Sequence, residues 1–313
     1  MQQLGCSPVL IRALGGGATQ FTISAGNPEM SAGQWDAGAF VGDEWRVNPA
    51  LTLSLGLRYE AQSNLAHWKD FSPRIAIAWA PGATAKTARL KTVVRAGFGI
   101  FYDRFALANT INARRYNGIV QQQYVVTNPD FFPMVPSISV IAAFQTPQTT
   151  QQISSTIRAP YVVQSAISLE RQLPFKSTLA LTYANAHGVH LLRSRDLNAP
   201  LPGTFNPLVP GSGVFPLGTP NPIFLLESSG IYNQNQFIAL LNSRFNRDFS
   251  LSASYVLNYA RSNTDGSGTF PAKPYDFTGE YGPAATDVRH RISVNGSIAT
   301  KWNVRFNPFV IFE

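Results

Sequence analysis

The feature of this sequence that most constrains its fold is a strict alternation of apolar and polar residues from Leu51 to Glu60. Every second residue from Leu51 to Tyr59 is Leu or Tyr, and the residues that alternate with them are Thr, Ser, Gly, Arg and Glu. A period of two predicts a strand with one apolar and one polar face. A tilted strand needs about 9–11 residues to cross a bilayer, whereas strands of soluble proteins average about 5–6 residues. The run therefore has the length of a membrane-crossing strand.

Two similar runs follow at residues 72–80 and 90–103, and the composition agrees with strands that meet lipid. Charged residues make up 13% of the chain, roughly half of the ~25% usual in soluble domains. Hydrophobic residues are 44% and the mean hydropathy is −0.04. No run of apolar residues is long enough for a transmembrane helix, so the strands would have to satisfy their backbone polar groups in a barrel.

The net charge of +8 comes from Lys and Arg residues that are scattered along the chain. We interpret them as lining a lumen and meeting anionic lipid head groups. No nucleic-acid-binding motif accompanies them, so no nucleic acid is expected as a partner. The single cysteine, Cys6, has no internal disulfide partner.

The connections between the predicted strands are of two kinds. Short turns fall near residues 49, 81, 174, 248 and 301, whereas long loops occupy residues 104–159, 189–230 and 263–285. Short periplasmic turns and long extracellular loops are typical of outer-membrane barrels. We expect residues 104–159 to contribute no spanning strand, and the segment "GIVQQQYVV" to be a strand within that extracellular loop.

The resulting prediction is an all-β fold, an antiparallel transmembrane β-barrel with about 11 long strands. The first of these strands is 20–25 and the last is 303–312. Bacterial single-chain barrels have an even number of strands, so an odd count predicts an incomplete barrel, an open and curved sheet.

Aromatic residues are expected to mark both membrane interfaces, as girdles do in such barrels. The residues placed at periplasmic strand ends are Trp45, Trp79, Phe175, Phe249 and Trp302. The residues placed at outer strand ends are Tyr59, Tyr102, Tyr161, Tyr183 and Tyr259.

Several pieces of the sequence resemble one family. They include "GDEWRVNPALTLSLGLRYE", "FSPRIAIAWAPG", "VVRAGFGIFYDRF", "YNQNQFIALLNSRFNRDFSLSASYVLNYARS" and "YGPAATDVRHRISVNG". In order and spacing they are similar to the TonB-dependent outer-membrane receptors of the Oar-like type. The resemblance covers most of the chain, from about Ala18 to Phe312, and it corresponds to the middle of the family's barrel.

The resemblance implies the barrel portion of a receptor that takes up a ligand across the cell outer membrane. Family members have a signal peptide, a plug domain with a TonB-contact segment and a barrel of about 22 strands. We expect residues 1–18 to be an irregular N-terminal segment and residues 19–313 to be a partial barrel, without plug or terminal strands. Because no secretory signal is recognisable, Met1 is not expected to be the start of the working protein. The implied partners are outer-membrane lipid, the protein's own plug domain, the TonB energy-coupling complex through that plug, and a small ligand of unknown identity.

Charged residues on the polar strand faces are candidates for contact with a plug or with the substrate path. The predicted lumen-facing residues are Arg58, Glu60, Arg95, Glu170, Arg289 and Arg291. A simpler role is that they solvate the lumen and pair with one another.

No pattern in the chain predicts catalysis, a cofactor or a metal. His187, His190 and Asp196 lie near each other in sequence, but a zinc site normally needs three or four convergent ligands. Nucleophile elbows and phosphate-binding loops are missing from the sequence. The acidic pair Asp43–Glu44 is expected at a strand end, on a solvated rim. The chain is therefore not predicted to be an enzyme.

Three other interpretations remain open at this point. A plugless outer-membrane porin or adhesin would share the strand pattern but would have no plug domain encoded upstream. A soluble glycan-binding β module would need no detergent for extraction. A truncated reading frame without independent function is compatible with the receptor interpretation, and the DNA on either side of the coding region would reveal it.

Overall fold

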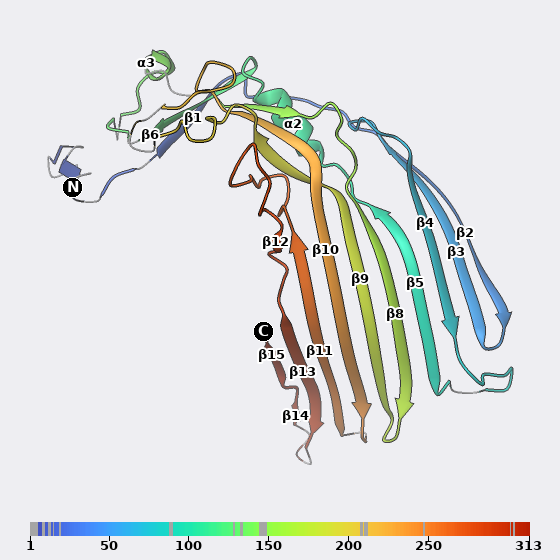
Figure 1. The fold of residues 1–313 in the computed structure, drawn as a ribbon. Coiled ribbons are helices and arrows are strands. Elements are labelled where there is room, and N and C mark those ends of the chain that lie inside the picture. The colour runs from blue at the N-terminus through green and yellow to red at the C-terminus, as the bar shows by residue number, and fades with distance from the viewer. Residues whose placement is uncertain are drawn as a thin grey trace.

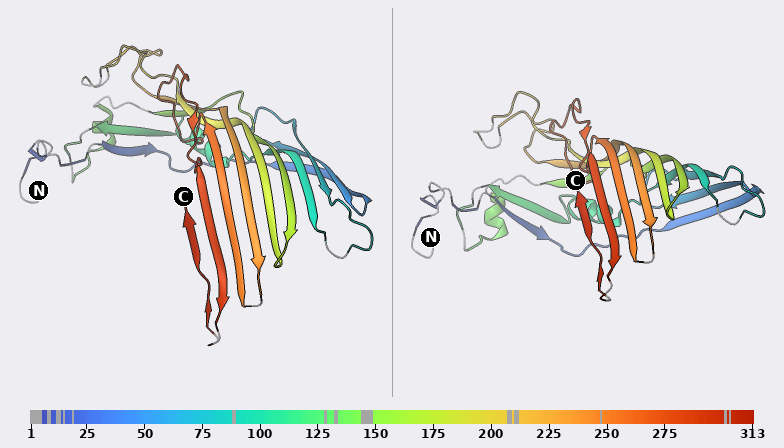
Figure 2. Two further views of the ribbon diagram at one scale, coloured as in Figure 1. Left: turned by 60° about the horizontal axis from the view of Figure 1, so that its bottom comes forward. Right: turned by 90° about the horizontal axis from the view of Figure 1, so that it is seen from below.

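The computed structural model describes residues 6–7, 10–11, 14, 16–18, 20–87, 90–127, 129–131, 134–143, 149–206, 209, 212–246, 248–300, 302 and 304–313. These residues form a 13-stranded sheet and a separate two-stranded sheet, with little helix (Figure 1). The large sheet is antiparallel along its main path and curved, and it is open at both edges (Figure 2). The predicted all-β, open antiparallel fold is confirmed.

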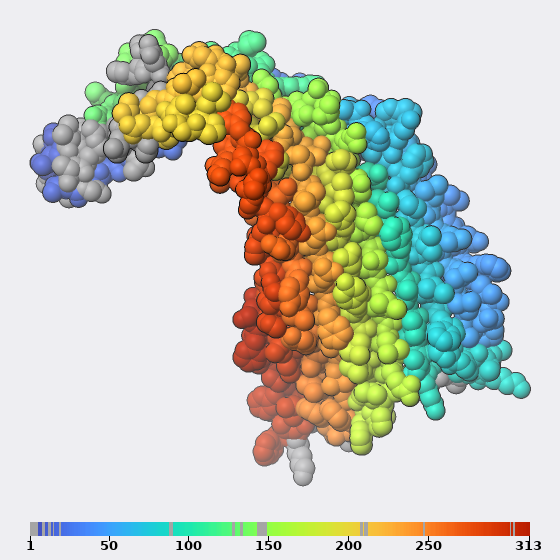
Figure 3. Space-filling model, viewed as in Figure 1, coloured from blue at the N-terminus to red at the C-terminus, as the bar shows by residue number. Residues whose placement is uncertain are grey.

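The long strands of this sheet, called the wall below, follow one another in chain order. They are β2 (Asp36–Asn48), β3 (Leu51–Gln62), β4 (Asp70–Trp79), β5 (Thr92–Tyr102), β8 (Tyr161–Leu173), β9 (Ser177–Asp196), β10 (Ile223–Arg244), β11 (Phe249–Ser262) and β13 (His290–Ala299). The short strands β14 (Arg305–Phe306) and β15 (Phe309–Phe312) both pair with β13. In the space-filling view the strands lie side by side in this order (Figure 3).

Cross-strand register divides the wall into an apolar face and a polar face. Leu55 pairs with Ile75, which pairs with Phe98, and these three side chains are 45–56% exposed. Their neighbours Ser54 and Ala76 form the equivalent pair on the other face. Exposed hydrophobic side chains in continuous rows cannot be explained by a buried core, and a contiguous apolar surface of this kind suits contact with lipid.

The N-terminal strand prediction was wrong in one respect. Residues 20–25 do form a strand, β1 (Gln20–Gly26), but it pairs with β6 (Gln121–Thr127) in the two-stranded sheet and not with the wall. The edges of the wall are therefore β2 at one side and β14 with β15 at the other. The predicted strand "GIVQQQYVV" corresponds to β6.

The long connection after β5 contains more structure than expected. Besides β6 it holds α2 (Leu107–Arg115), α3 (Ile138–Ala143) and β7 (Thr150–Ile153). β7 pairs in parallel with the first residues of β10, an exception in an antiparallel sheet. In the part of this connection that the structure describes, no strand spans the full height of the wall, as predicted.

β9 and β10 are longer than the sequence pattern indicates. The predicted loop 189–230 is strand up to Asp196 and again from Ile223, and a bulge interrupts the pairing between Glu227 and Ile231. In these outer halves, positions on the apolar face carry polar side chains, such as His187 and Asn233. Tyr183 therefore lies within β9 and not at a strand end, but it still stands next to the level at which the apolar face becomes polar, which is where the outer girdle was predicted.

The position of Asp43 and Glu44 was also predicted wrongly. Both lie within β2, where Asp43 is opposite Leu55 and Glu44 is opposite Ser54. The alternation is preserved through them, so Asp43 occupies the apolar face of an edge strand. Charged residues on edge strands discourage edge-to-edge association, which gives a physical reason for a carboxylate at this place.

Aromatic pairs mark the loop end of the wall. Tyr59 packs on Phe71, and Tyr102 packs on Tyr161, with ring centroids 5.2 and 5.1 Å apart. β12 (Gly282–Pro283) pairs with β11 at the same end. Beneath the loops lies a small core of Phe105, Ile157 and Leu226. Among the described residues, no helix is long and apolar enough to cross a membrane.

The turn between β8 and β9 is strained at two residues. Phe175 and Lys176 have φ values of 59° and 53°, in the left-handed region that glycine tolerates best. Replacing Lys176 with glycine should stabilise the folded barrel by about 1 kcal/mol, measured by urea unfolding of the complete protein. Lys86→Gly, in the turn region after β4 and without a positive φ, is the control. A similar gain from Lys86→Gly would contradict the explanation.

Candidate functional site: the polar face and the loop end

Four of the six predicted lumen-facing residues form two close ion pairs. Arg58 Nε lies 2.8 Å from a carboxylate oxygen of Glu60, one position further along the same face of β3. Arg95 Nη1 lies 2.8 Å from Glu170 Oε2, across the pairing of β5 with β8. Alternation places each pair on a single face, so these residues neutralise one another within the wall.

The other two predicted residues are paired elsewhere. Arg291 is 3.0 Å from Glu313 beside β15, at the edge of the wall. Arg289 lies over the ring of Tyr259 at 3.8 Å and pairs with Asp287 at 2.8 Å. A hydrogen bond from the backbone N–H of Ala260, aided by Arg289, lowers the pKa of the Asp287 carboxyl below its usual value. The structure thus does not bring the six residues together into one cluster.

The polar face contains a wide depression that charge-based reasoning missed. Its cavity volume is about 540 Å³. Two rows of residues that pair across neighbouring strands line it. The first row is Gly56, Arg74, Gly99, Gln164, Ala186 and Gln234. The second row is Ser54, Ala76, Gly97, Ala166, Ala184 and Gln236. Most of these residues have no side chain or a very short one, so the depression is a gap in the side-chain layer of the wall.

Two of the glycines in the depression are not required by the wall itself. A Cβ built on Gly97 would lie 3.7 Å from the Ile75 carbonyl oxygen, and one on Gly56 would lie 3.8 Å from that of Val41, both ordinary contacts. Gly99 is different, because the ring of Phe101 lies within 3.0 Å of where its Cβ would be. Glycine weakens a strand interior, so Gly56 and Gly97 need a reason outside the wall.

Arg74 is the charged residue of this depression. Its guanidinium lies over the Phe101 ring, 4.6 Å from the centroid. Unlike Arg58 and Arg95, Arg74 forms no ion pair within 4.0 Å among the residues that the structure describes. The depression therefore offers one uncompensated positive charge beside a floor of small residues and amide side chains.

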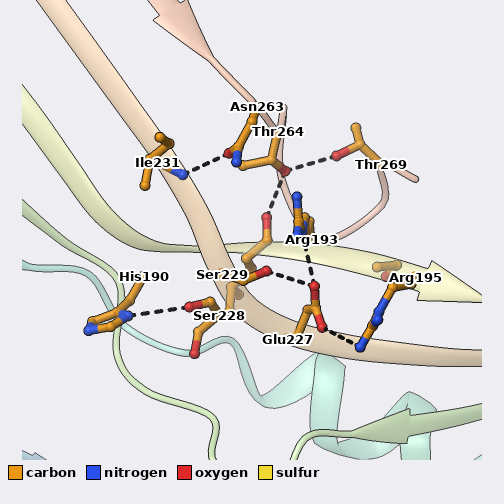
Figure 4. A network of polar contacts seen from close by, with 12 residues as sticks. His190, Arg193, Arg195, Glu227, Ser228, Ser229, Ile231, Asn263, Thr264 and Thr269 are labelled. Carbon is orange, nitrogen blue, oxygen red and sulfur yellow. Dashed lines mark hydrogen bonds and ion pairs between the residues drawn. The ribbon is translucent and has the colours of Figure 1, made fainter. Parts of the chain in front are cut away.

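A second polar cluster lies at the loop end, in the long outer parts of β9 and β10 (Figure 4). The Glu227 carboxylate forms ion pairs with Arg193 Nε at 3.0 Å and with Arg195 Nη2 at 3.2 Å. The hydroxyl of Ser229 donates to the same carboxylate at 2.7 Å. The ring of Phe277 covers Arg193 at 3.6 Å from the guanidinium carbon. The sequence pattern missed this cluster because it falls in a predicted loop.

The histidines do not assemble a metal site. His187 Nδ1 contacts the Asn233 side chain at 2.6 Å, and His190 Nδ1 lies 3.3 Å from the Ser228 carbonyl oxygen. In the described part of the chain, no group of three or more His, Cys, Asp or Glu side chains is placed to hold a metal ion.

An open antiparallel wall with one lipid-suited face, one polar face and long loops at a single end defines the class of outer-membrane β-barrel proteins. The sequence profile of the outer membrane beta barrel domain matches residues 10–67 and 62–305. The chain belongs to this family, and its place is the outer membrane. No curated protein sequence matches the chain.

Solved structures with the same fold are transporters and receptors of the outer membrane. The outer membrane transporter YddB from Escherichia coli is 14% identical, with a TM-score of 0.57 over 90% of this chain and 33% of that one. The siderophore receptor PirA from Pseudomonas aeruginosa is 13% identical, with a TM-score of 0.52 over 89% of this chain and 39% of that one. The FrpB iron transporter from Neisseria meningitidis is 10% identical, with a TM-score of 0.52 over 89% of this chain and 32% of that one. The chain thus spans about a third of the length of these structures, and the likeness concerns the fold.

Proposed function

We propose that this chain is part of the barrel wall of a TonB-dependent receptor of the Oar-like type, which takes up a ligand across the outer membrane of a Gram-negative bacterium. The quoted sequence pieces support the subtype, and the fold shared with YddB and PirA supports the receptor class. In this proposal residues 1–18 are an irregular N-terminal segment, and residues 19–313, the wall together with its loops, are a partial barrel. The lumen-facing residues are Arg58, Glu60, Arg95, Glu170, Arg289 and Arg291. The pairing of Arg58 with Glu60 and of Arg95 with Glu170 favours the solvating role. We do not assign an enzymatic activity.

The open edges support completion of the barrel by further strands of the same protein. β2 has no partner on one side among the described residues, and the same holds beyond β14 and β15. Each unpaired backbone group in lipid costs several kcal/mol, so an open wall does not persist in a bilayer. A fragment of a longer barrel accounts for both edges.

The observation that carries the proposal is the depression on the polar face. Gly56 and Gly97 leave room that the wall itself could fill, and Arg74 lacks a carboxylate partner in the described chain. Both features are explained if a plug domain packs directly against the backbone of Gly56 and Gly97 and places a carboxylate next to Arg74. The plug would also connect the wall to the TonB energy-coupling complex, and the ligand would be a small molecule of unknown identity.

Gly97→Thr in the complete protein tests the plug. Threonine is more favourable than glycine in a strand by up to about 1 kcal/mol, so a wall that no plug covers should become more stable. Against a packed plug the added side chain should instead cost about 1–3 kcal/mol and loosen the plug. We expect the second result, measured by urea unfolding of the plug and of the wall in purified protein.

Ala180→Thr is the matched control. Ala180 shares the polar face with Glu170 but lies outside the depression, so its replacement should leave plug and wall nearly unchanged. Stabilisation of the whole protein by Gly97→Thr would contradict the proposal and favour a plugless porin or adhesin.

A further inference from the structure

Arg193 is a buried cation with an unused hydrogen-bond donor. Its side chain is 3% exposed, and Nε is held by Glu227. Among the residues that the structure describes, Nη1 has no hydrogen-bond partner. A buried donor without a partner costs about 1–3 kcal/mol, so such a group calls for an explanation. In Figure 4 the outer part of the guanidinium points away from Glu227, toward Thr264 and Thr269.

A cavity of about 150 Å³ lies on that side of Arg193. The loop after β11 supplies most of its lining, including the polar residues Ser262, Asn263, Thr264, Asp265, Thr269 and Glu280. The loop is fixed to β9 by hydrogen bonds, from Thr264 Oγ1 to the Leu192 carbonyl oxygen at 2.9 Å and from the Ser194 N–H to the Thr269 carbonyl oxygen at 3.0 Å. The cavity is therefore a polar, partly open depression in the folded loop end.

The charges around this cavity are opposite in sign and do not touch. Arg193 makes no ion pair with Asp265 or Glu280, and neither carboxylate pairs with any cation within 4.0 Å in the described chain. Glu280 accepts the backbone N–H of Ala272 at 2.8 Å, and Asp265 accepts that of Ala285 at 3.4 Å. Each carboxylate therefore keeps acceptor capacity for a ligand.

We propose that this cavity binds a small zwitterion of the size of a free α-amino acid. The carboxylate of the ligand meets Arg193, whose Nη1 gains its missing acceptor, and the ammonium group meets Asp265 and Glu280. A simple anion would leave both acidic residues unpaired, and a simple amine would leave Nη1 of Arg193 without an acceptor, because Glu227 pairs only with Nε. An engineered cavity of about 150 Å³ holds one benzene molecule, which has about as many non-hydrogen atoms as alanine. The site does not depend on a plug or on energy coupling.

The test uses the complete protein in detergent and three probes of equal size, L-alanine, L-lactate and L-alaninamide. L-Lactate carries a hydroxyl in place of the ammonium group, and amidation removes the carboxylate. We expect L-alanine to bind in calorimetric titration at least about tenfold more tightly than either of the other two. Equal binding of L-lactate would identify a simple anion site and overturn the proposal. Absence of binding by all three would mean that the cavity holds bridging water only, which overturns it as well.

Two variants locate the binding without removing the buried arginine. Asp265→Asn and Glu280→Gln should each weaken L-alanine binding about tenfold, because each removes one charge next to the ammonium group. Glutamine at position 280 can still accept the Ala272 N–H, so the loop should keep its fold. Asp276→Asn lies on the same loop outside the cavity lining and should leave the affinity unchanged. Unaltered binding in both cavity variants would place the ligand elsewhere.

Discussion

Replacing Glu227 with alanine is expected to destabilise the outer ends of β9 and β10 by about 3–5 kcal/mol. The physical reason is that Arg193, 3% exposed, and Arg195, 28% exposed, would lose the carboxylate that lies between them. Two partly or fully buried guanidinium groups would then repel each other beneath Phe277. Amide hydrogen exchange in the complete protein should report the loss as faster exchange at the loop end, while the membrane-crossing parts of the strands keep their protection.

The matched control is Glu170→Ala, which breaks the ion pair with Arg95. Those side chains are 38% and 51% exposed, so solvent screens their interaction and the cost should stay below about 1 kcal/mol. The double replacement Arg193→Met with Glu227→Leu should recover most of the stability lost in Glu227→Ala, because it removes the buried pair and leaves unpaired only Arg195, whose side chain is 28% exposed and can be solvated. Equal costs for Glu227→Ala and Glu170→Ala would contradict the assignment of a buried network.

Leu55→Arg should have the second largest effect, a loss of about 2–4 kcal/mol on insertion of the complete barrel into lipid. Leu55 lies between Asp43 and Ile75 in a row of the apolar face, near the middle of β3. An arginine there would carry its charge into hydrocarbon, and the variant is made in an Asp43→Asn background so that the carboxylate opposite position 55 cannot pair with it. Heat-modifiable gel migration after folding into liposomes should reveal a reduced inserted fraction.

Thr52→Arg is the nearby control, because Thr52 lies on the polar face opposite Ala78 and outside the depression. Its charge would project into water, so the inserted fraction should remain near that of the unmodified protein. Similar losses for both variants would mean that the two faces are assigned the wrong way round.

Alternation alone predicts the membrane-crossing strands well, because each strand there has lipid on one face and water on the other. β3, β4 and β5 lie where the pattern places them. The pattern fails where that environment ends. In β9 and β10 the outward positions beyond Tyr183 become polar, so strands that continue past the membrane look like loops. For 20–25 the strand is real, but alternation carries no information about its partner, β6.

The candidate sites were harder to predict for a related reason. Arg95 and Glu170 stand out as charges in polar strand positions, and the structure pairs them. Gly56, Gly97 and Ala166 are small residues that do not stand out individually in the sequence. They line one depression only because the register of five strand pairings brings them side by side. Glu227 pairs with Arg193 across β9 and β10, next to a β-bulge that the local sequence pattern does not predict.

The parallel pairing of β7 with β10 constrains the order in which the barrel mouth can assemble. Gln151 and Ile153 pair with Phe224 and Leu226, and the other side of the same stretch of β10 pairs with β9. β7 thus docks onto a strand that follows it by about seventy residues in the chain, and closing a loop of that length is slow compared with forming the β8–β9 hairpin. The connection between β5 and β8, although synthesised early, therefore acquires its final position only after β10 is in place. The loop end of the wall therefore reaches its final shape only in this late step.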